Sequence, residues 1–465
     1  MTRIKYLNSF IGDKDFYKKL MTVALPIVIQ NTITNLAGLL DNVMVGQIGT
    51  NAMNGVSVVN QLMFVFNLCV WGVVCSAGIF SAQFFGKGDH QGLMYTFRAK
   101  IIFSLVVSAA SLFLLYFKGS FLILQFLHQT DGIGNIDQTL QNAQIYLKIM
   151  LWGLVPLCLA MAYSNTLRSI GQTALPMKAG VAGVFVNLVL NYVLIFGHFG
   201  FPVLGVKGAA IATVISRFVE LFIIVFWTHM HQQENRFIVG AYKSLKIPGA
   251  LMANILLKGA PLALNEAMWA LGLTLLNQSY SLRGMSVIAA LNINSTILNL
   301  FNVFLFAMGE AIAIIVGNLL GAKKYEEARL SARRLIFMSV LSCFVIGSIL
   351  LLCRNIFPQI YNTEAEVRFL ASKFIVISAI FMPIMACVHG CYFTLRCGGK
   401  TVITLLFDSV FVWFFAVPTA ACLTRFTSLD IFPIYLAVTS LDILKACIGI
   451  ILVKKGIWVN NIVSD

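Results

Sequence analysis

Charged side chains are scarce in this sequence. They make up 11% of the 465 residues, against 59% hydrophobic residues, whereas a soluble domain is about one quarter charged. A chain of this composition has too little charge to keep its surface in water. We therefore expect an all-α polytopic membrane protein, with the lipid bilayer as its solvent.

Signals of enzyme chemistry are also lacking. The stretch Gly86-Lys87-Gly88-Asp89 does not have the spacing of a phosphate-binding loop. Cys387, His389 and Cys391 do not share one helical face, and the other histidines show no metal-ligand spacing. We expect a protein that is not an enzyme and needs no cofactor, with an ion gradient as its natural energy source.

Lysine and arginine outnumber the acidic residues and give a net charge of +15. If the amino terminus is cytoplasmic and successive spans alternate in direction, every basic cluster falls on the cytoplasmic side. This positive-inside bias predicts both termini in the cytoplasm and an even number of spans, and it explains the charge without nucleic acid. The clusters are Lys14, Lys18 and Lys19; Lys87, Arg98 and Lys100; Arg236, Lys243, Lys246 and Lys258; Lys323, Lys324, Arg329, Arg333 and Arg334; Arg396 and Lys400; Lys454 and Lys455.

Apolar runs of about 20 residues, the length that spans a bilayer, predict twelve transmembrane helices. The second and the eighth are longer than the bilayer needs. The predicted spans are residues 20–45, 54–84, 97–117, 144–167, 173–197, 206–228, 255–282, 287–320, 333–353, 369–395, 402–424 and 430–453.

The two halves of the sequence are copies of each other. The matched positions are Pro26 and Pro261, Gly49 and Gly284, Gly86 and Gly321 and, after a small deletion, the stretches 166–173 and 394–401. Transporters built from parallel repeats of this kind bind substrate near the bilayer midplane and expose it to each side in turn. We divide the chain into an N-lobe (1–228), a cytoplasmic linker (229–254) and a C-lobe (255–465), each lobe with six transmembrane helices.

Three carboxylates lie inside predicted spans and occur in only one half of the repeat: Asp41, Glu266 and Asp408. An ionisable group at membrane depth is costly and usually serves a function, so we interpret all three as candidate ion-coupling groups. Two further pairs, Arg217 with Glu220 and Asp442 with Lys445, are three residues apart on one helix. That spacing predicts structural ion pairs.

Pro26 and Pro261 lie inside the first helix of each half, where proline removes a backbone hydrogen bond and permits a kink. A fixed bend and a moving one are equally compatible with the sequence.

Several of these motifs resemble the multidrug and toxic compound extrusion (MATE) transporters. The resemblance covers residues of about 15 to 455. It is carried by Ala24-Leu25-Pro26, the stretch 41–49, the stretch 86–89, the stretch 205–213 and the twin Leu-Arg-x-x-Gly-x-Thr stretches of residues 167–173 and 395–401. It implies a two-lobed antiporter of twelve helices that exports small, mostly cationic and amphipathic organic compounds in exchange for Na⁺ or H⁺.

The resemblance also implies site residues. Asp41, Asn187 and Thr213 match the family's N-lobe cation site, in which a second aspartate is expected where this chain has Asn191. Glu266 matches a C-lobe cation position, and Asp408 resembles an acidic position of one branch of the family. We expect a monomer in the cell membrane, because nothing in the sequence demands a partner chain.

Two other functions stay open. One is a metabolite exporter of the same fold with narrow specificity, which no sequence feature separates from a broad exporter. The other is a flippase of lipid-linked oligosaccharides. A flippase would need basic groups for a pyrophosphate, whereas the three unmatched groups above are acidic.

Overall fold

The computed structural model describes residues 10–126, 135–361 and 363–464. Every regular element among these residues is a helix, because the apolar runs have no water to bond to and satisfy their backbone groups within each helix. The helices of the first half are α2 (Lys14–Gly46), α3 (Thr50–Lys87), α4 (His90–Phe126), α5 (Ile136–Met150), η1 (Leu151–Gly153), α6 (Leu154–Ser169), α7 (Ala174–Phe196), η2 (His198–Gly200) and α8 (Val206–Met230).

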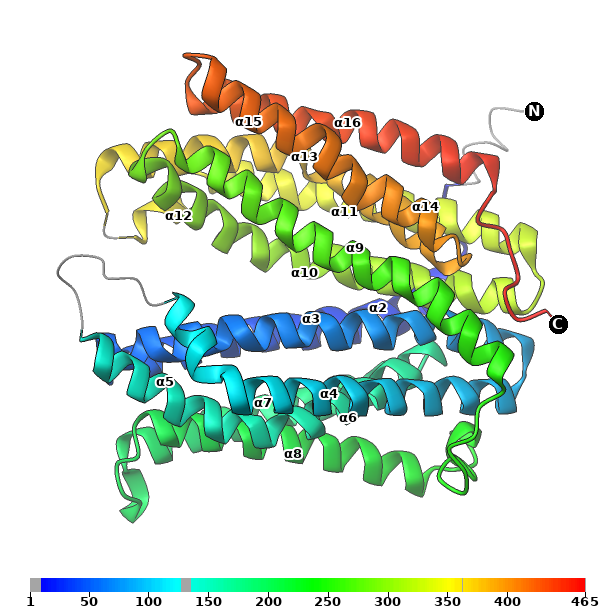
Figure 1. The fold of residues 1–465 in the computed structure, drawn as a ribbon. Coiled ribbons are helices and arrows are strands. Elements are labelled where there is room, and N and C mark those ends of the chain that lie inside the picture. The colour runs from blue at the N-terminus through cyan, green and yellow to red at the C-terminus, as the bar shows by residue number, and fades with distance from the viewer. Residues whose placement is uncertain (1–9, 127–134, 362, 465) are drawn as a thin grey trace. The chain divides into compact units, whose positions relative to one another are not determined.

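The linker contains the short helix η3 (Arg236–Ile238). The helices of the second half are α9 (Gly249–Ser281), α10 (Met285–Gly321), α11 (Tyr325–Leu352), α12 (Ile356–Gln359), α13 (Ala365–Cys397), α14 (Thr401–Leu405), the π-helical segments η4 (Leu406–Val410) and η5 (Val412–Ala416), α15 (Val417–Phe426) and α16 (Ile431–Lys455). Within each half the long helices run side by side (Figure 1).

The all-α membrane class is confirmed. Among the described residues, eleven helical stretches are long and apolar enough to cross a membrane, and α5 to α6 and α14 to α15 each count as one. The one remaining predicted span, residues 255–282, lies in α9, which has 33 residues; this helix carries Lys258, Asn265 and Glu266, which lower its mean hydropathy. Pro26 and Pro261 lie inside α2 and α9, as predicted.

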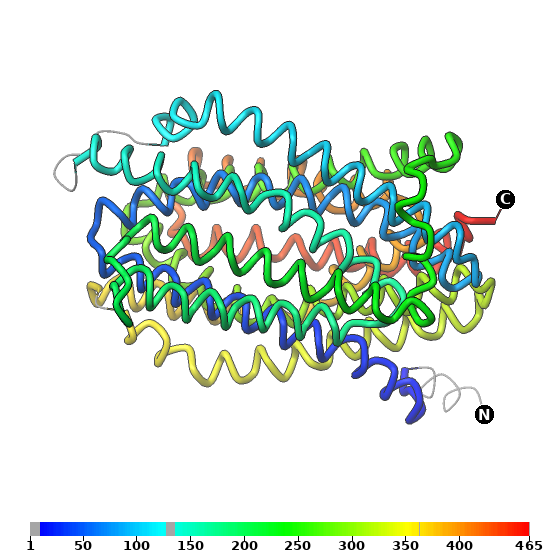
Figure 2. The backbone as a smooth tube through the Cα atoms, turned by 90° about the horizontal axis from the view of Figure 1, so that it is seen from below, coloured from blue at the N-terminus to red at the C-terminus, as the bar shows by residue number. Residues whose placement is uncertain are grey.

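Several helices extend beyond their predicted spans. The predicted span 97–117 is part of α4, which runs over 37 residues. The predicted span begins at residue 97, close to Arg98 and Lys100, whereas the helix begins earlier, at His90, and both basic side chains are buried. Figure 2 follows this helix along its whole length.

The chain forms two compact units. One, here called the N-unit, comprises Pro26–Ser81 and Asp89–Ala253; the other, the C-unit, comprises Met1–Leu25, Ala82–Gly88 and Asn254–Asp465. The linker therefore groups with the first half, while two short segments of the first half group with the second.

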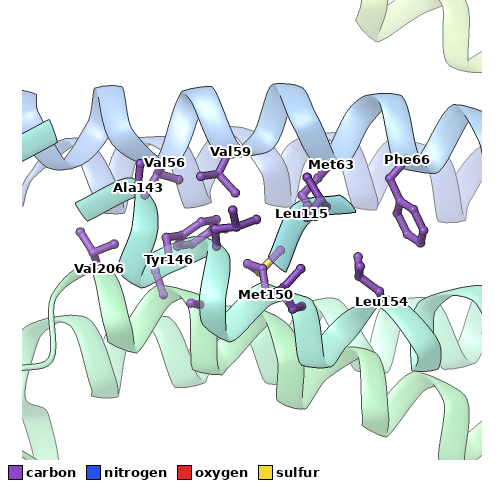
Figure 3. Packing of buried hydrophobic residues seen from close by; sticks show 14 of the residues in the cluster. Val56, Val59, Met63, Phe66, Leu115, Ala143, Tyr146, Met150, Leu154 and Val206 are labelled. Atoms are coloured by element: carbon purple, nitrogen blue, oxygen red, sulfur yellow. The ribbon is translucent and has the colours of Figure 1, made fainter. Parts of the chain in front are cut away.

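The N-unit is packed around an apolar core. Val56, Val59 and Met63 of α3 face Tyr146 and neighbouring side chains of α5 (Figure 3). Helices α7 and α8 approach closely at Gly208, where an added Cβ would lie 2.6 Å from the Leu194 carbonyl oxygen. Small residues allow such contacts between membrane helices. This explains the Gly-Ala-Ala stretch of residues 208–210.

The linker is fixed within the N-unit by Arg98. Its guanidinium donates to the backbone carbonyl oxygens of Gly240, Ala241 and Lys246 at 2.8–2.9 Å. Tyr242 of the linker shares a hydrogen bond with Tyr163 of α6, and burial raises the pKa of Tyr242 above its usual value. Arg98 is therefore a structural residue of the linker.

The carboxyl-terminal ends of α3 and α10 pack closely against each other in the C-unit. An added Cβ on Gly86 would lie 1.9 Å from the Asn318 carbonyl oxygen, and one on Gly321 would lie 1.9 Å from that of Gln83. Gly86 and Gly321 occupy matching positions of the repeat, so the internal symmetry places two glycines at one crossing.

The carboxyl-terminal tail covers these ends. Trp458 is 1% exposed, and Asn461 donates to the carbonyl oxygens of Leu320 and Gly321 at 3.1 and 3.2 Å. The amide of Gln83 donates to the Cys397 carbonyl oxygen at 3.0 Å and accepts from the Ile462 backbone N–H at 2.8 Å. The tail thus ties α3, α10 and α13 together inside the C-unit.

Candidate ion-coupling sites

The N-unit brings together the four residues predicted for its cation site. Asn187 and Asn191 are one turn apart on α7 and so share a face. The Asn191 amide donates to Asp41 Oδ1 of α2 at 2.6 Å and to Asn187 Oδ1 at 3.2 Å. Asn187 in turn donates to Thr213 Oγ1 of α8 at 3.3 Å. We call these four residues the Asp41 cluster.

The packing of the helices positions this cluster. The close approach at Gly208 holds α8 against α7, and Thr213, little more than one turn later, donates to the Ala209 carbonyl oxygen at 3.0 Å. Asn187 and Asn191 are 6% and 1% exposed, so water cannot replace their hydrogen bonds freely. The cluster offers one carboxylate with amide and hydroxyl oxygens, a set that suits a hard monovalent cation or a proton.

The sequence reading missed Tyr146 at this site. The Tyr146 side chain of α5 is buried in the core of the N-unit and lies close to Thr213. A tyrosine in an apolar run of a membrane helix gives a weak signal, because tyrosine is also common as ordinary core packing.

The C-unit joins Glu266 and Asp408 in a second network. Asn265 of α9 donates to Asp408 Oδ2 at 3.0 Å and to the Tyr392 hydroxyl at 3.2 Å, and that hydroxyl donates to Glu266 Oε1 at 3.4 Å. Asp408 lies in the π-helical segment η4. Such segments inside α-helices often mark functional positions.

Both acids of this network contact basic side chains. Lys445 of α16 lies 2.6 Å from Asp408 Oδ1, and Arg396 Nη1 of α13 lies 3.8 Å from Glu266 Oε1. Lys445 and Arg396 are 5% and 4% exposed. The network that we call the Glu266–Asp408 network therefore contains two carboxylates and two cations.

This arrangement corrects the two predicted intrahelical pairs. In the part of the chain that the structure describes, Lys445 pairs with Asp408 rather than with Asp442. Arg217 donates to the Gly153 carbonyl oxygen at 3.3 Å and makes no ion pair with Glu220 there. A spacing of three residues permits an ion pair on one helix, but the contacts that Lys445 and Arg217 make here are to residues of other helices.

The long apolar helices define a polytopic membrane protein that carries partly buried acids within its helices. The MatE family model matches residues 26–193 and 261–422. The chain therefore belongs to the MatE family, the MATE transporters that its motifs resemble, which is a family of transporters and not of enzymes.

Relatives named as probable multidrug resistance proteins align with nearly the whole chain. The probable multidrug resistance protein NorM of Thermotoga maritima is 25% identical, with 95% of this chain and 93% of that protein aligned. The probable multidrug resistance protein NorM of Oceanobacillus iheyensis is 28% identical over 90% of this chain and 92% of its own length.

Solved structures share the fold. A multidrug resistance MATE transporter of the MOP superfamily in an outward-facing conformation matches with a TM-score of 0.84 at 18% identity and 97% coverage of both chains. A mutant of the Vibrio cholerae MATE transporter VcmN matches with a TM-score of 0.85 at 17% identity, covering 95% of this chain and 97% of that one.

Proposed function

We propose that this chain is a cation-coupled antiporter that exports small organic compounds, cationic and amphipathic ones in particular, by alternating access. Na⁺ or H⁺ moves inward across the cell membrane as the compound leaves. The protein acts as a monomer with both termini in the cytoplasm. The names of the relatives, several of them probable multidrug resistance proteins, support the substrate class.

The Asp41 cluster is the observation that carries this proposal. It places a carboxylate, two amides and a hydroxyl in hydrogen-bonded sequence at α2, α7 and α8. An acid kept at membrane depth with oxygen-bearing neighbours is a natural place for a coupling ion. We assign primary coupling to Asp41, with Asn191, Asn187 and Thr213 as supporting ligands.

The Glu266–Asp408 network is the second candidate. We rank it below the Asp41 cluster because Lys445 and Arg396 already lie against its two acids. Glu266 is the acid there that is more open to a proton, since its basic neighbour is 3.8 Å away while that of Asp408 is 2.6 Å away.

Efflux from proteoliposomes tests the proposal. Purified protein would be reconstituted into liposomes loaded with ethidium, and a gradient that drives Na⁺ or H⁺ into the liposomes would be imposed. We expect gradient-driven efflux that Asp41→Asn abolishes and that Glu266→Gln only weakens. Asp137→Asn and Glu366→Gln, which change exposed carboxylates, are the matched controls and should leave efflux unchanged.

Two results would contradict the proposal. Efflux that persists in Asp41→Asn but is lost in Glu266→Gln would move coupling to the C-unit. Folded protein that moves no cationic dye under either gradient would rule out broad export of cationic compounds.

A further inference from the structure

We infer that Lys445 is a built-in counter-ion whose ammonium group occupies the Asp408 carboxylate in place of a metal cation, so that the C-unit acids do not bind Na⁺. The inference rests on the proposed cation coupling, because it concerns which cation the second candidate site accepts. It assigns to Lys445 a role in ion selectivity that goes beyond a structural pair.

The geometry at Asp408 supports this role. Lys445 Nζ is 2.6 Å from Oδ1, and the Asn265 amide is 3.0 Å from Oδ2, so each carboxylate oxygen holds a donor. The ammonium also lies over the rings of Phe407 and Phe411, at 5.6 and 5.9 Å from their centroids. Aromatic faces stabilise a cation that has lost its water.

The surroundings contain the oxygens that a metal cation would need. Ser409 Oγ lies 2.7 Å from the Asn265 side-chain oxygen, and the Tyr392 hydroxyl lies 3.2 Å from the Asn265 amide nitrogen. With both Asp408 oxygens, this is a set of hard oxygen ligands on α9, α13 and η4. The ammonium of Lys445 lies on one of these oxygens, Asp408 Oδ1.

Charge balance points the same way. The Glu266–Asp408 network has two acids, Glu266 and Asp408, and two cations in ion-pair contact with them, Arg396 and Lys445. Asp442, one turn before Lys445 on α16, and His389 of α13 also lie within electrostatic range of the Asp408–Lys445 pair. Adding Na⁺ to the Asp408–Lys445 pair would place two cations on one largely buried carboxylate, which is unfavourable at membrane depth.

The Asp41 cluster is built differently. Its ligand chain consists of one carboxylate, two amides and a hydroxyl. The two units therefore differ in their cation: Asp41 of the N-unit binds the coupling ion from solution, whereas Asp408 of the C-unit is paired with the ammonium of Lys445 on α16.

Binding of ²²Na⁺ to purified protein tests the inference. All variants carry Asp41→Asn, so that the N-unit does not contribute to the signal. We expect no saturable Na⁺ binding in this background. Adding Lys445→Met, which keeps the length of the side chain and removes its charge, should create a saturable Na⁺ site, and adding Asp408→Asn should remove it again.

Two further variants serve as controls. Lys445→Arg keeps the positive charge and should not bind Na⁺. Lys445→Gln removes the charge but keeps a hydrogen-bond donor for Asp408, and it replaces Lys445→Met if that variant does not fold. In either folded variant, Na⁺ should also raise the melting temperature in a saturable way.

Either of two results would overturn the inference. One is saturable Na⁺ binding in Asp41→Asn protein with Lys445 intact that Asp408→Asn removes. The other is folded Lys445→Met or Lys445→Gln protein that gains no Na⁺ binding. Neither result depends on efflux, so a failure of the proposed transport function would remain distinguishable from a failure of this inference.

Discussion

At the scale of single residues, the amide of Asn191 holds the candidate coupling acid in place. Its side chain donates to Asp41 at 2.6 Å and is 1% exposed. A hydrogen bond to a charged group contributes about 1.5–3 kcal/mol. We therefore predict that Asn191→Ala weakens activation of efflux by the coupling ion by about tenfold or more, measured as the ion concentration for half-maximal ethidium efflux.

Asn292→Ala is the matched control, because it removes an exposed amide from α10. It should leave the half-maximal concentration unchanged. If Asn191→Ala also left it unchanged, Asn191 would not be a ligand of the coupling site.

Lys100 gives a second prediction at this scale. The ammonium is 0% exposed and donates to Thr166 Oγ1 of α6 at 3.0 Å. Removing one partner of a buried charge costs more than replacing the charge by an apolar group of similar shape. We expect Thr166→Val to lower the melting temperature in detergent, by a destabilisation of about 1–3 kcal/mol, and Lys100→Met to lower it less or to raise it. The opposite order would show that Thr166 does not stabilise the ammonium.

Single residues also show what the sequence could predict. Asp41, Asn187, Asn191 and Thr213 were predicted as one site, and the structure brings them into hydrogen-bonding distance. The partner of Lys445 was not predictable. Its helix offers Asp442 at a suitable spacing, and only the packing of α16 against η4 places Asp408 closer.

At the scale of elements, the crossing of α3 and α10 in the C-unit depends on two glycines. A Cβ on Gly86 or on Gly321 would lie 1.9 Å from a backbone carbonyl oxygen. A backbone atom cannot move aside as a flexible side chain can, so the helix ends must separate. We predict that Gly86→Ala and Gly321→Ala each destabilise the protein by about 3 kcal/mol, seen as a lower melting temperature.

Gly38→Ala is the control for this prediction. Gly38 also lies in a helix, α2, but an added Cβ would have nothing within 4 Å. Because alanine favours a helix over glycine by about 1 kcal/mol, this variant should be neutral or slightly stabilised. Equal losses at Gly38 and Gly86 would show that the close crossing has no special role.

The linker gives the other prediction for elements. The Arg98 guanidinium donates hydrogen bonds to three backbone carbonyl oxygens of the linker. A planar guanidinium is the side-chain group best suited to several fixed acceptors. Lys243 and Lys246 are exposed, but the linker backbone around them is held by these bonds, so we predict that Arg98→Ala speeds tryptic cleavage at these lysines in inside-out vesicles and that Arg98→Lys gives an intermediate rate. Arg329→Ala, which removes a half-exposed arginine of α11, should leave the rate at the wild-type value.

Element boundaries were predictable only in part. Long apolar runs predicted the twelve spans, since length and hydropathy are local properties. The π-helical turns η4 and η5 around Asp408 were not predicted. They depend on hydrogen bonds shifted by one residue, and residue types in an apolar run do not specify such a shift.

At the scale of the whole molecule, the internal repeat was the most informative feature of the sequence. It predicted two halves of six helices, and the matched glycines 86 and 321 meet at one crossing. The packing of the carboxyl-terminal tail was not predictable. Its residues have no counterpart at the end of the first half, and they stay in place through contacts with segments more than 100 residues away, such as Leu320 and Gln83.

That tail gives the last prediction. Trp458 is 1% exposed, its indole N–H donates to the Val453 carbonyl oxygen at 3.0 Å, and Gly398 packs against its backbone. Replacing a buried tryptophan by alanine costs about 3–5 kcal/mol. We therefore expect Trp458→Ala to lower the melting temperature strongly.

Gln83→Ala should lower the melting temperature as well, because Gln83 bonds to Cys397, Asn460 and Ile462. In the double variant the two losses should be less than additive, since residues in one hydrogen-bonded and packed group are coupled. Fully additive losses would mean that the tail and the end of α3 stabilise the C-unit independently.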